Sequence, residues 1–415
     1  MYNHNLNTRQ STGKLMVFVF GGEKVKPIIG AKVTITGHNQ NVTLETNESG
    51  QTQTVVLPAG EPYFAYSVNV SAIGYNSVKL EGVQVVPNTT GIQEIQMTLS
   101  IQTDNDRSTE EYKITPHKLT QPEAIKPVID PIVIPDPQPK PLPHPQSLPD
   151  GSPIGLLIPE YIIVHCGAPQ EPAAKIKVKF TDYITKVACA EIHPAWHPEA
   201  LKANILCITS YTLNKIFTQA YLGFDVTCLK QFDFRYNHFQ TTYKNIIELV
   251  DTLFNQYIKH PDHEKKQPLL TEYRAHYTRK KPCKLGQFKS QELAKKGYNY
   301  LDILNYFYDL CFGPIRITSG SGVIFRGRPT PTLETILKEG SSGSDVRKIQ
   351  VMLNEISKRY RKIPKIKEDG NFINITTEAV KTFQQIFSIP QDGNVDFRTW
   401  YKISSLYYSI LATYR

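Results

Sequence analysis

Long apolar runs are missing from this 415-residue chain, and their absence excludes whole classes of protein. No stretch approaches the roughly 18 consecutive apolar residues that a membrane-spanning helix needs. The first twenty residues contain only the short apolar run from Leu15 to Phe20, with no small-residue cleavage site after it. We therefore expect no signal peptide and no contact with a membrane.

Paired cysteines are also missing. The six cysteines include no Cys-x-x-Cys motif, and most have apolar neighbours in the sequence. The first interpretation is a set of buried free thiols, and the second is a structural zinc that uses Cys228, Cys283 and a histidine. All six lie in the central part of the chain, at Cys166, Cys189, Cys207, Cys228, Cys283 and Cys311.

Charge is distributed unevenly along the chain. Residues 1–150 hold 11 Lys+Arg and 14 Asp+Glu, whereas the rest carries a net charge of +12. A basic body suits an anionic polymer, either a nucleic acid or a cell-wall glycan. The runs Lys265–Lys266 and Arg279–Lys281 alone are typical of a solvated face, and no recognition helix accompanies them, so we expect no nucleic-acid partner.

Four regions follow one another, and together they predict a multidomain α+β protein. Residues 1–101 contain seven short alternating runs separated by Gly and Pro turns, which indicates an all-β sandwich. Residues 102–155 include twelve prolines between Pro116 and Pro153, so we expect an extended linker that cannot form strands and is open to proteolysis.

Residues 156–330 predict a mixed α/β domain. Strands are expected in LLIPEYIIVHCG and AKIKVKF, and helices over 198–217 and about 242–258. Pro198 fits the first helical turn, and Gly297 fits the end of a third helix, SQELAKKG, before a fourth, LDILNYFYD.

Residues 331–415 contain an internal repeat. Asp369-Gly370-Asn371-Phe372 precedes Thr376, and Asp392-Gly393-Asn394-Val395 precedes Thr399. Each copy predicts a tight turn followed by a threonine that caps a helix, with Ser344 capping the helix in front. The pattern predicts three short helices.

Glu191 is the strongest candidate for chemistry. It follows the small apolar run Val187–Ala190, interpreted as a strand end, and no Lys or Arg lies within four positions. Such surroundings would desolvate the carboxyl and raise its pKa, which suits an acid that protonates a glycosidic oxygen. Asp182 and Glu199 are nearby in sequence as second carboxylates, but a mechanism with one carboxylate fits as well.

His193 and His197 have the i, i+4 spacing of metal ligands. Pro194 and Pro198 break the helix that would align them, so we expect these histidines to line a cleft or cap a helix. No metal and no cofactor is therefore expected.

Residues 338–400 resemble the peptidoglycan-binding type 1 domain. The family's A-V-x-x-F-Q helix and closing T-W match Ala379-Val380, Phe383-Gln384 and Thr399-Trp400. The resemblance implies peptidoglycan as the partner of this domain.

Residues 180–309 resemble the SpoIID/LytB domain of sporulation and cell-wall proteins. The stretch FTDYITKVACAEIHPAWHPEALKAN places Glu191 on the family's catalytic glutamate. The resemblance implies a lytic transglycosylase with Glu191 as its acid and with Lys202, Tyr211, Gln287 and Ser290 as substrate-binding residues. The sequence departs from the family at Ile192, His193, Thr209, Gly286, Phe288 and Lys289.

The order of the four regions resembles the SleC-like family of spore cortex-lytic enzymes. That resemblance implies a zymogen held in the dormant spore, in the cortex or coat region. A subtilisin-like Csp protease would cut it between about 130 and 160 at germination. The alternative, motivated by the departures, is a non-catalytic peptidoglycan-binding protein of the spore or envelope.

Overall fold

The computed structural model describes residues 11–21, 26–100, 108–117, 156–261, 268–275, 283–325, 328–331, 333 and 335–413. The chain folds into two compact units. The first combines residues 1–116 with the short segment 239–245, and the second comprises residues 117–238 and 246–415. No helix among the described residues is long and apolar enough to cross a membrane.

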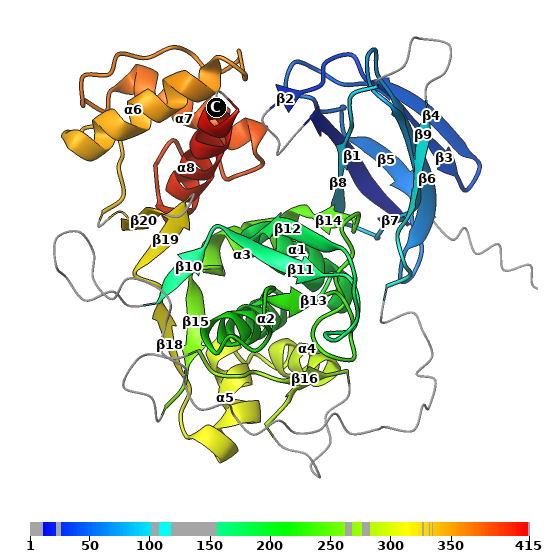
Figure 1. Cartoon of the computed structure of the whole chain (residues 1–415), viewed down its shortest axis with the longest axis vertical. Coiled ribbons are helices and arrows are strands. Elements are labelled where there is room, and N and C mark those ends of the chain that lie inside the picture. Colours follow the sequence, from blue (N-terminus) through cyan, green and yellow to red (C-terminus); the bar gives the residue numbers. More distant parts are fainter. Residues whose placement is uncertain are drawn as a thin grey trace, which may run out of the picture. The chain divides into compact units, whose positions relative to one another are not determined.

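The first unit is a β-sandwich, as its alternating runs predicted (Figure 1). In β6 the buried residues alternate with partly exposed ones, which places Tyr66, Val68 and Val70 in the core. The strands of the two sheets are β1 (Thr12–Gly21), β2 (Lys26–Pro27), β5 (Val55–Pro58), β8 (Thr90–Gln96) and β14 (Thr242–Tyr243) in one, and β3 (Lys32–Gly37), β4 (Gln40–Glu45), β6 (Phe64–Ser71), β7 (Ser77–Val85) and β9 (Thr109–Lys113) in the other.

Two strands of this sandwich differ from the expectation. β9 lies inside the range expected to be a strand-free linker, and it pairs with β7 in parallel register. β14 comes from the second half of the chain and pairs antiparallel with β8, with Thr242 opposite Ile92 and Tyr243 opposite Gly91. The predicted cleavage region overlaps residues 118–155, which lie outside the described residues.

The second unit is built around α2 (Pro198–Phe217). This helix has the predicted bounds, with Pro198 in its first turn, and His197 caps it by accepting from the N–H of Glu199. α2 packs against α1 (Phe180–Glu191), α4 (Gln287–Lys295), α5 (Tyr300–Phe312) and β15 (Gln256–Lys259). A helix that is surrounded on all sides loses the single apolar stripe of a surface helix.

Small sheets and one further helix complete this part. β11 (Tyr161–His165) lies between β12 (Lys175–Lys179) and β13 (Val226–Thr227). The remaining elements are β10 (Leu157–Pro159), α3 (Lys244–Leu253), β16 (Tyr273–Arg274), β17 (Leu285–Gly286), β18 (Arg316–Ser319), β19 (Gly322–Phe325) and β20 (Arg328–Pro331).

Two predictions for these elements were wrong. Val187–Ala190 do not end a strand, because they form the last turns of α1, in which nearly every residue is buried and the helical period is hidden. The helix expected over 242–258 is only α3, with β14 before it and β15 after it. Both strands pair with segments that are distant in the sequence, and local periodicity carries no information about such partners.

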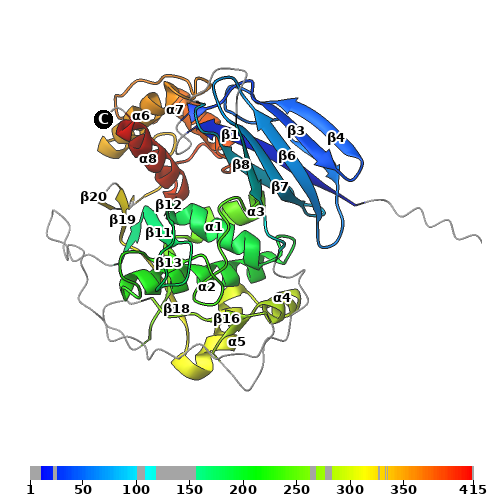
Figure 2. The same ribbon diagram turned by 45° about the vertical axis from the view of Figure 1, so that its right-hand side comes forward.

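The C-terminal helices are α6 (Ser344–Ser357), α7 (Asn374–Ile386) and α8 (Phe397–Ala412), which Figure 2 shows as one group. The predicted threonine caps were wrong. Thr376 and Thr399 instead lie buried within hydrogen-bonding distance of the amides of Gln350 and Gln384. Ser344 does not cap α6 either, because Gly343 occupies the cap position.

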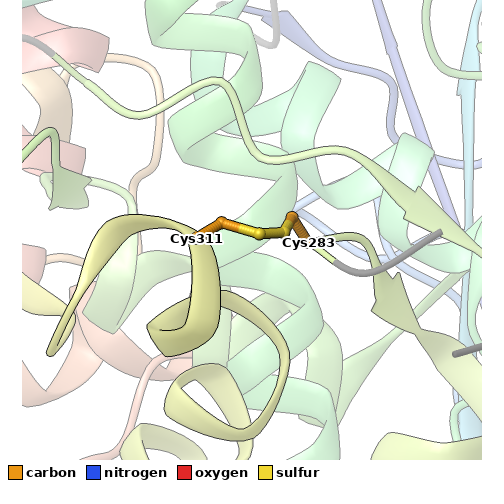
Figure 3. The surroundings of a disulfide bond; sticks show 2 residues. All are labelled: Cys283 and Cys311. Carbon is orange, nitrogen blue, oxygen red and sulfur yellow. A yellow bond between two sulfur atoms is a disulfide. The ribbon is translucent and has the colours of Figure 1, made fainter.

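The prediction of six free thiols was also wrong. Cys283 and Cys311 form a disulfide that joins the residues before β17 to the end of α5 (Figure 3). This pairing also removes Cys283 from the zinc site considered above. Cys189 and Cys207 are buried free thiols as expected, and Cys166 and Cys228 are partly exposed.

Candidate active site

Glu191 is the last residue of α1, and its side chain has no exposed surface. The chain turns to an extended conformation at Ile192, whose N–H still bonds to the carbonyl of Ala188. Burial of a carboxyl is costly unless polar partners surround it. The groups around Glu191 therefore decide what it can do.

Three segments distant from Glu191 in the sequence supply its contacts. The backbone N–H of Arg235 donates to Oε1 at 3.3 Å, and the Gln287 side chain donates to the backbone carbonyl of Glu191 at 3.2 Å. Tyr273 also forms a hydrogen bond with the Glu191 side chain. Burial, the nearby Glu191 carboxyl and this bond raise the pKa of Tyr273 well above its ordinary value, so its hydroxyl keeps its proton.

An aromatic wall extends from this cluster. The rings of Tyr273 and Phe234 stack with centroids 4.8 Å apart, and Tyr211 meets Phe234 edge-on at 4.9 Å. Phe234 is fully buried beside Arg235, so the stack fixes the backbone that contacts Glu191.

Asp233 fixes the other side of the same loop. Its carboxylate accepts from the Tyr211 hydroxyl at 3.1 Å and from the N–H of Thr227 at 2.8 Å. Burial, and then the charge of Asp233, raise the pKa of Tyr211 well above its ordinary value. The structure therefore places Tyr211, predicted to bind substrate, as an anchor of the loop that carries Arg235.

Gln287 and Ser290 lie at the start of α4, and both are buried. The Ser290 hydroxyl donates to the carbonyl of Gln287 at 2.6 Å and accepts from Asn204 on α2 at 2.9 Å. Gln287 reaches the end of α1 directly, and Ser290 holds the turn from which it projects. Of these two predicted residues, Gln287 contacts Glu191 and Ser290 contacts Gln287.

Lys202 and the two extra carboxylates are engaged elsewhere. Lys202 pairs with Glu199 at 2.6 Å, and the other Glu199 oxygen accepts from the N–H of Tyr300 at 2.8 Å. Burial alone would raise the pKa of Glu199, but these bonds lower it below its ordinary value. Asp182 lies in the first turn of α1, about 13 Å along the helix axis from Glu191 at 1.5 Å per residue.

The histidines after Glu191 shape the loop between α1 and α2. His193 accepts from the N–H of Ala195, and His197 caps α2 as one of its two expected roles. No group of three His, Cys, Asp or Glu residues within the described ranges is arranged to hold a metal ion. The basic runs Lys265–Lys266 and Arg279–Lys281 lie outside those ranges.

Four residues near Glu191 were missed or undervalued in the sequence. Arg235 acts through its backbone, which no side-chain motif reveals, and Tyr273 reaches Glu191 from a segment that carries no recognisable motif. Trp196 and Phe288 form an aromatic pair with centroids 5.6 Å apart, and Phe288 is 40% exposed. Their positions beside Glu191 and Gln287 in the sequence were the available signal.

Comparisons with known proteins agree with the two domain resemblances. Residues 171–266 match the family model described as stage II sporulation protein, and residues 342–403 match that of a peptidoglycan binding domain. No curated protein matches the chain.

Two solved structures that match are the SleB N-terminal domain and the Bacillus anthracis TIE protein. The first is 28% identical, with 18% of this chain and 97% of that chain covered and a TM-score of 0.16. The second is 19% identical, with 23% and 20% covered and a TM-score of 0.18. The assignment therefore rests on the family models: the chain carries a stage II sporulation protein segment followed by a peptidoglycan-binding domain.

Proposed function

We propose that this protein is the zymogen of a spore cortex-lytic enzyme, a lytic transglycosylase that cleaves the glycan strands of peptidoglycan. The observation that carries the proposal is Glu191, a buried carboxyl in the matched sporulation segment, held by Arg235, Tyr273 and Gln287. The peptidoglycan-binding domain delivers the enzyme to its polymer.

In the proposed reaction Glu191 acts first as an acid and then as a base. Its proton goes to the glycosidic oxygen as the bond from that oxygen to C1 breaks. The resulting carboxylate then removes the proton of the sugar's own C6 hydroxyl, whose oxygen bonds to C1. The products are a free 4-hydroxyl and a 1,6-anhydro end, and no water is consumed.

The positions of the other carboxylates support a mechanism with a single acid. Asp182 is at the far end of α1, and Glu199 is bonded to Lys202 and to the N–H of Tyr300. Asp233 is bonded to Tyr211 and Thr227. Hydrolysis with two carboxylates requires a second group that is available to activate water or attack C1.

Burial of Glu191 supports the zymogen part of the proposal. A side chain with no exposed surface cannot contact a polymeric glycan, so the described state is closed. We infer that opening begins when a subtilisin-like protease of the Csp type cuts the Pro-rich segment, in the cortex or coat region of the germinating spore, and that it is complete once the N-terminal fragment has left.

The test compares intact protein with cut protein, meaning protein that is cleaved in the Pro-rich segment and freed of its N-terminal fragment. Both are assayed on decoated spores and on purified cortex glycan, with the products identified by mass spectrometry. Cut protein should release 1,6-anhydro-muramic ends, and intact protein should not. Glu191→Gln should lower the rate about 10²- to 10⁴-fold. Glu378→Gln, which alters an exposed carboxylate paired with Lys381 on α7, is the matched control. Undiminished activity of Glu191→Gln would reject the assignment.

A second candidate is a non-catalytic peptidoglycan-binding protein of the spore or envelope. The departures at Ile192, His193, Thr209 and Phe288 favour it, because they lie in the matched motif or at α4. Binding of the cut protein to insoluble peptidoglycan with no turnover would select this alternative.

A further inference from the structure

We propose that the β-sandwich keeps the Glu191 site closed by an exchange of segments, and that cutting the linker alone does not separate the two parts. The sandwich binds residues 239–245, which follow the linker in the sequence, along the edge of β8. In the opposite direction, His117 precedes the linker in the sequence but belongs to the second unit. The activity consequence rests on the proposed function, whereas the physical association does not.

The first tie is a set of hydrogen bonds between residues 239–245 and the sandwich. The buried Thr241 hydroxyl accepts from the N–H of Gln84 at 3.1 Å and donates to Gln93 at 3.0 Å. The Thr242 hydroxyl donates to the carbonyl of Ile92 at 3.0 Å. These bonds add to the antiparallel pairing of β14 with β8. A short strand added to a sheet edge in this way is a known mode of segment recognition.

Ring stacking and two further hydrogen bonds connect the same segment to both sheets of the sandwich. Phe239 stacks on Tyr112 of β9 with centroids 3.9 Å apart, and its carbonyl accepts from Gln93 at 3.3 Å. Tyr243 is fully buried, and its hydroxyl donates to the carbonyl of Gln84 at 3.4 Å. The segment therefore contacts β7, β8 and β9, and it covers an otherwise open edge of β8.

The loop just before this segment holds Glu191. Arg235, four residues before Phe239, donates its N–H to the Glu191 carboxyl. Lys186, on the same helix as Glu191, donates to the carbonyl of His238. The stretch from Arg235 to His238 is thus attached at both ends to α1 and leads directly into the strand held by the sandwich. Release of β14 frees one end of the backbone that covers Glu191.

His117 is the second tie. The residue is 4% exposed, and its Nε2 lies 3.3 Å from the carbonyl oxygen of Ile192, the residue after Glu191. Any cut within residues 118–155 leaves His117 on the N-terminal fragment. After cleavage the N-terminal fragment therefore still contacts Ile192 through His117, and the C-terminal fragment still contacts the sandwich through residues 239–245. The first contact is next to Glu191, and the second is next to the loop that covers it.

The experiment uses the full chain with a recognition sequence for a site-specific protease placed within residues 118–155. After cutting, the two fragments are run on a gel-filtration column. A synthetic peptide of residues 237–247 is then added as a competitor for the β8 edge. Hydrogen–deuterium exchange at residues 234–238 reports whether the loop over Glu191 has opened.

The expected result is co-elution of the cut fragments, and release of the N-terminal fragment when the peptide is added. Exchange at 234–238 should stay slow after cutting and rise at least about tenfold after release. Thr241→Val with Thr242→Val, which removes the hydroxyls and preserves shape, should speed dissociation at least about tenfold. Thr382→Val on α7 is the matched control.

Separation of the fragments as soon as the linker is cut would overturn the proposal. So would peptide-induced release with no change in exchange at 234–238. The competitor needs no variant, so the proposal stays testable if the double variant does not fold. Repeating the gel filtration with Glu191→Gln separates the two questions, because association should be unchanged whether or not the protein cleaves glycan.

Discussion

Two buried polar groups of this protein, the Gln384 amide and the Glu191 carboxyl, are satisfied in opposite ways. Gln384 bonds to Gly393, Asn394, Asp392 and Thr399, all within 15 residues. Glu191 is held by groups that are 44 to 96 residues away. A local network survives as long as its helix pair is folded, whereas a network of distant segments can be opened by moving one of them.

The C-terminal network also occurs twice. Gln350 accepts from the N–H of Gly370 and donates to the carbonyl of Asn371, as Gln384 does with Gly393 and Asn394. The contacts of Glu191 instead come from three single segments that are distant in the sequence. This contrast agrees with the proposed roles, in which the C-terminal domain is an anchor that stays folded and the Glu191 site changes state on activation.

The largest effect is expected from Gln384→Leu. The change leaves the buried N–H of Gly393 and the carbonyl of Asn394 without their partner, and each costs about 1–3 kcal/mol. Unfolding in urea should show a loss of about 4 kcal/mol. Gln385→Leu, at the exposed neighbouring position, should change stability by less than about 0.5 kcal/mol. Equal effects of the two variants would show that the network is not what stabilises these helices.

Next in size is the disulfide, which spans 28 residues of sequence and brackets Leu285–Gly286 and α4. Removing it with Cys283→Ser and Cys311→Ser should cost about 3 kcal/mol, because the unfolded chain regains its freedom. Reductant should reproduce this loss in the native protein and leave the double variant unchanged. Cys166→Ser is the control. If the unfolding midpoint of the native protein does not change when reductant is added, the expectation is contradicted.

The contrast also explains what the sequence could reveal. α2 was predictable because Pro198 and the apolar spacing act within one segment, and the turns at Gly370 and Gly393 are equally local. Thr242 and Tyr243 were misjudged because their partner β8 is about 150 residues away. Glu191 was predictable from its apolar neighbours and from the resemblance, but Arg235 and Tyr273 reach it only through long-range packing, which periodicity does not encode.

A smaller effect is expected from Gln287→Leu, which removes the bond to the Glu191 carbonyl. One such bond is worth about 1 kcal/mol of stability. Because the bond positions the acid and does not bind glycan, kcat of the cut enzyme should fall about tenfold while KM stays constant. Lys289→Met, at a partly exposed position of the same helix where the side chain pairs with Glu292, is the control. A change in KM alone would assign Gln287 to substrate binding.

The smallest effect on folding is expected at the aromatic pair of Trp196 and Phe288, which also joins distant segments. Phe288 is 40% exposed, so the pair buries little in the protein itself and offers an apolar face to a sugar ring. Trp196→Ala should raise KM about fivefold, equivalent to about 1 kcal/mol of lost binding, with little change in the unfolding midpoint. Leu310→Ala, at a more exposed site on α5, should change neither quantity. If Trp196→Ala instead lowers the midpoint by several degrees with KM unchanged, the pair is a structural contact like the Gln384 network, and the glycan is held elsewhere.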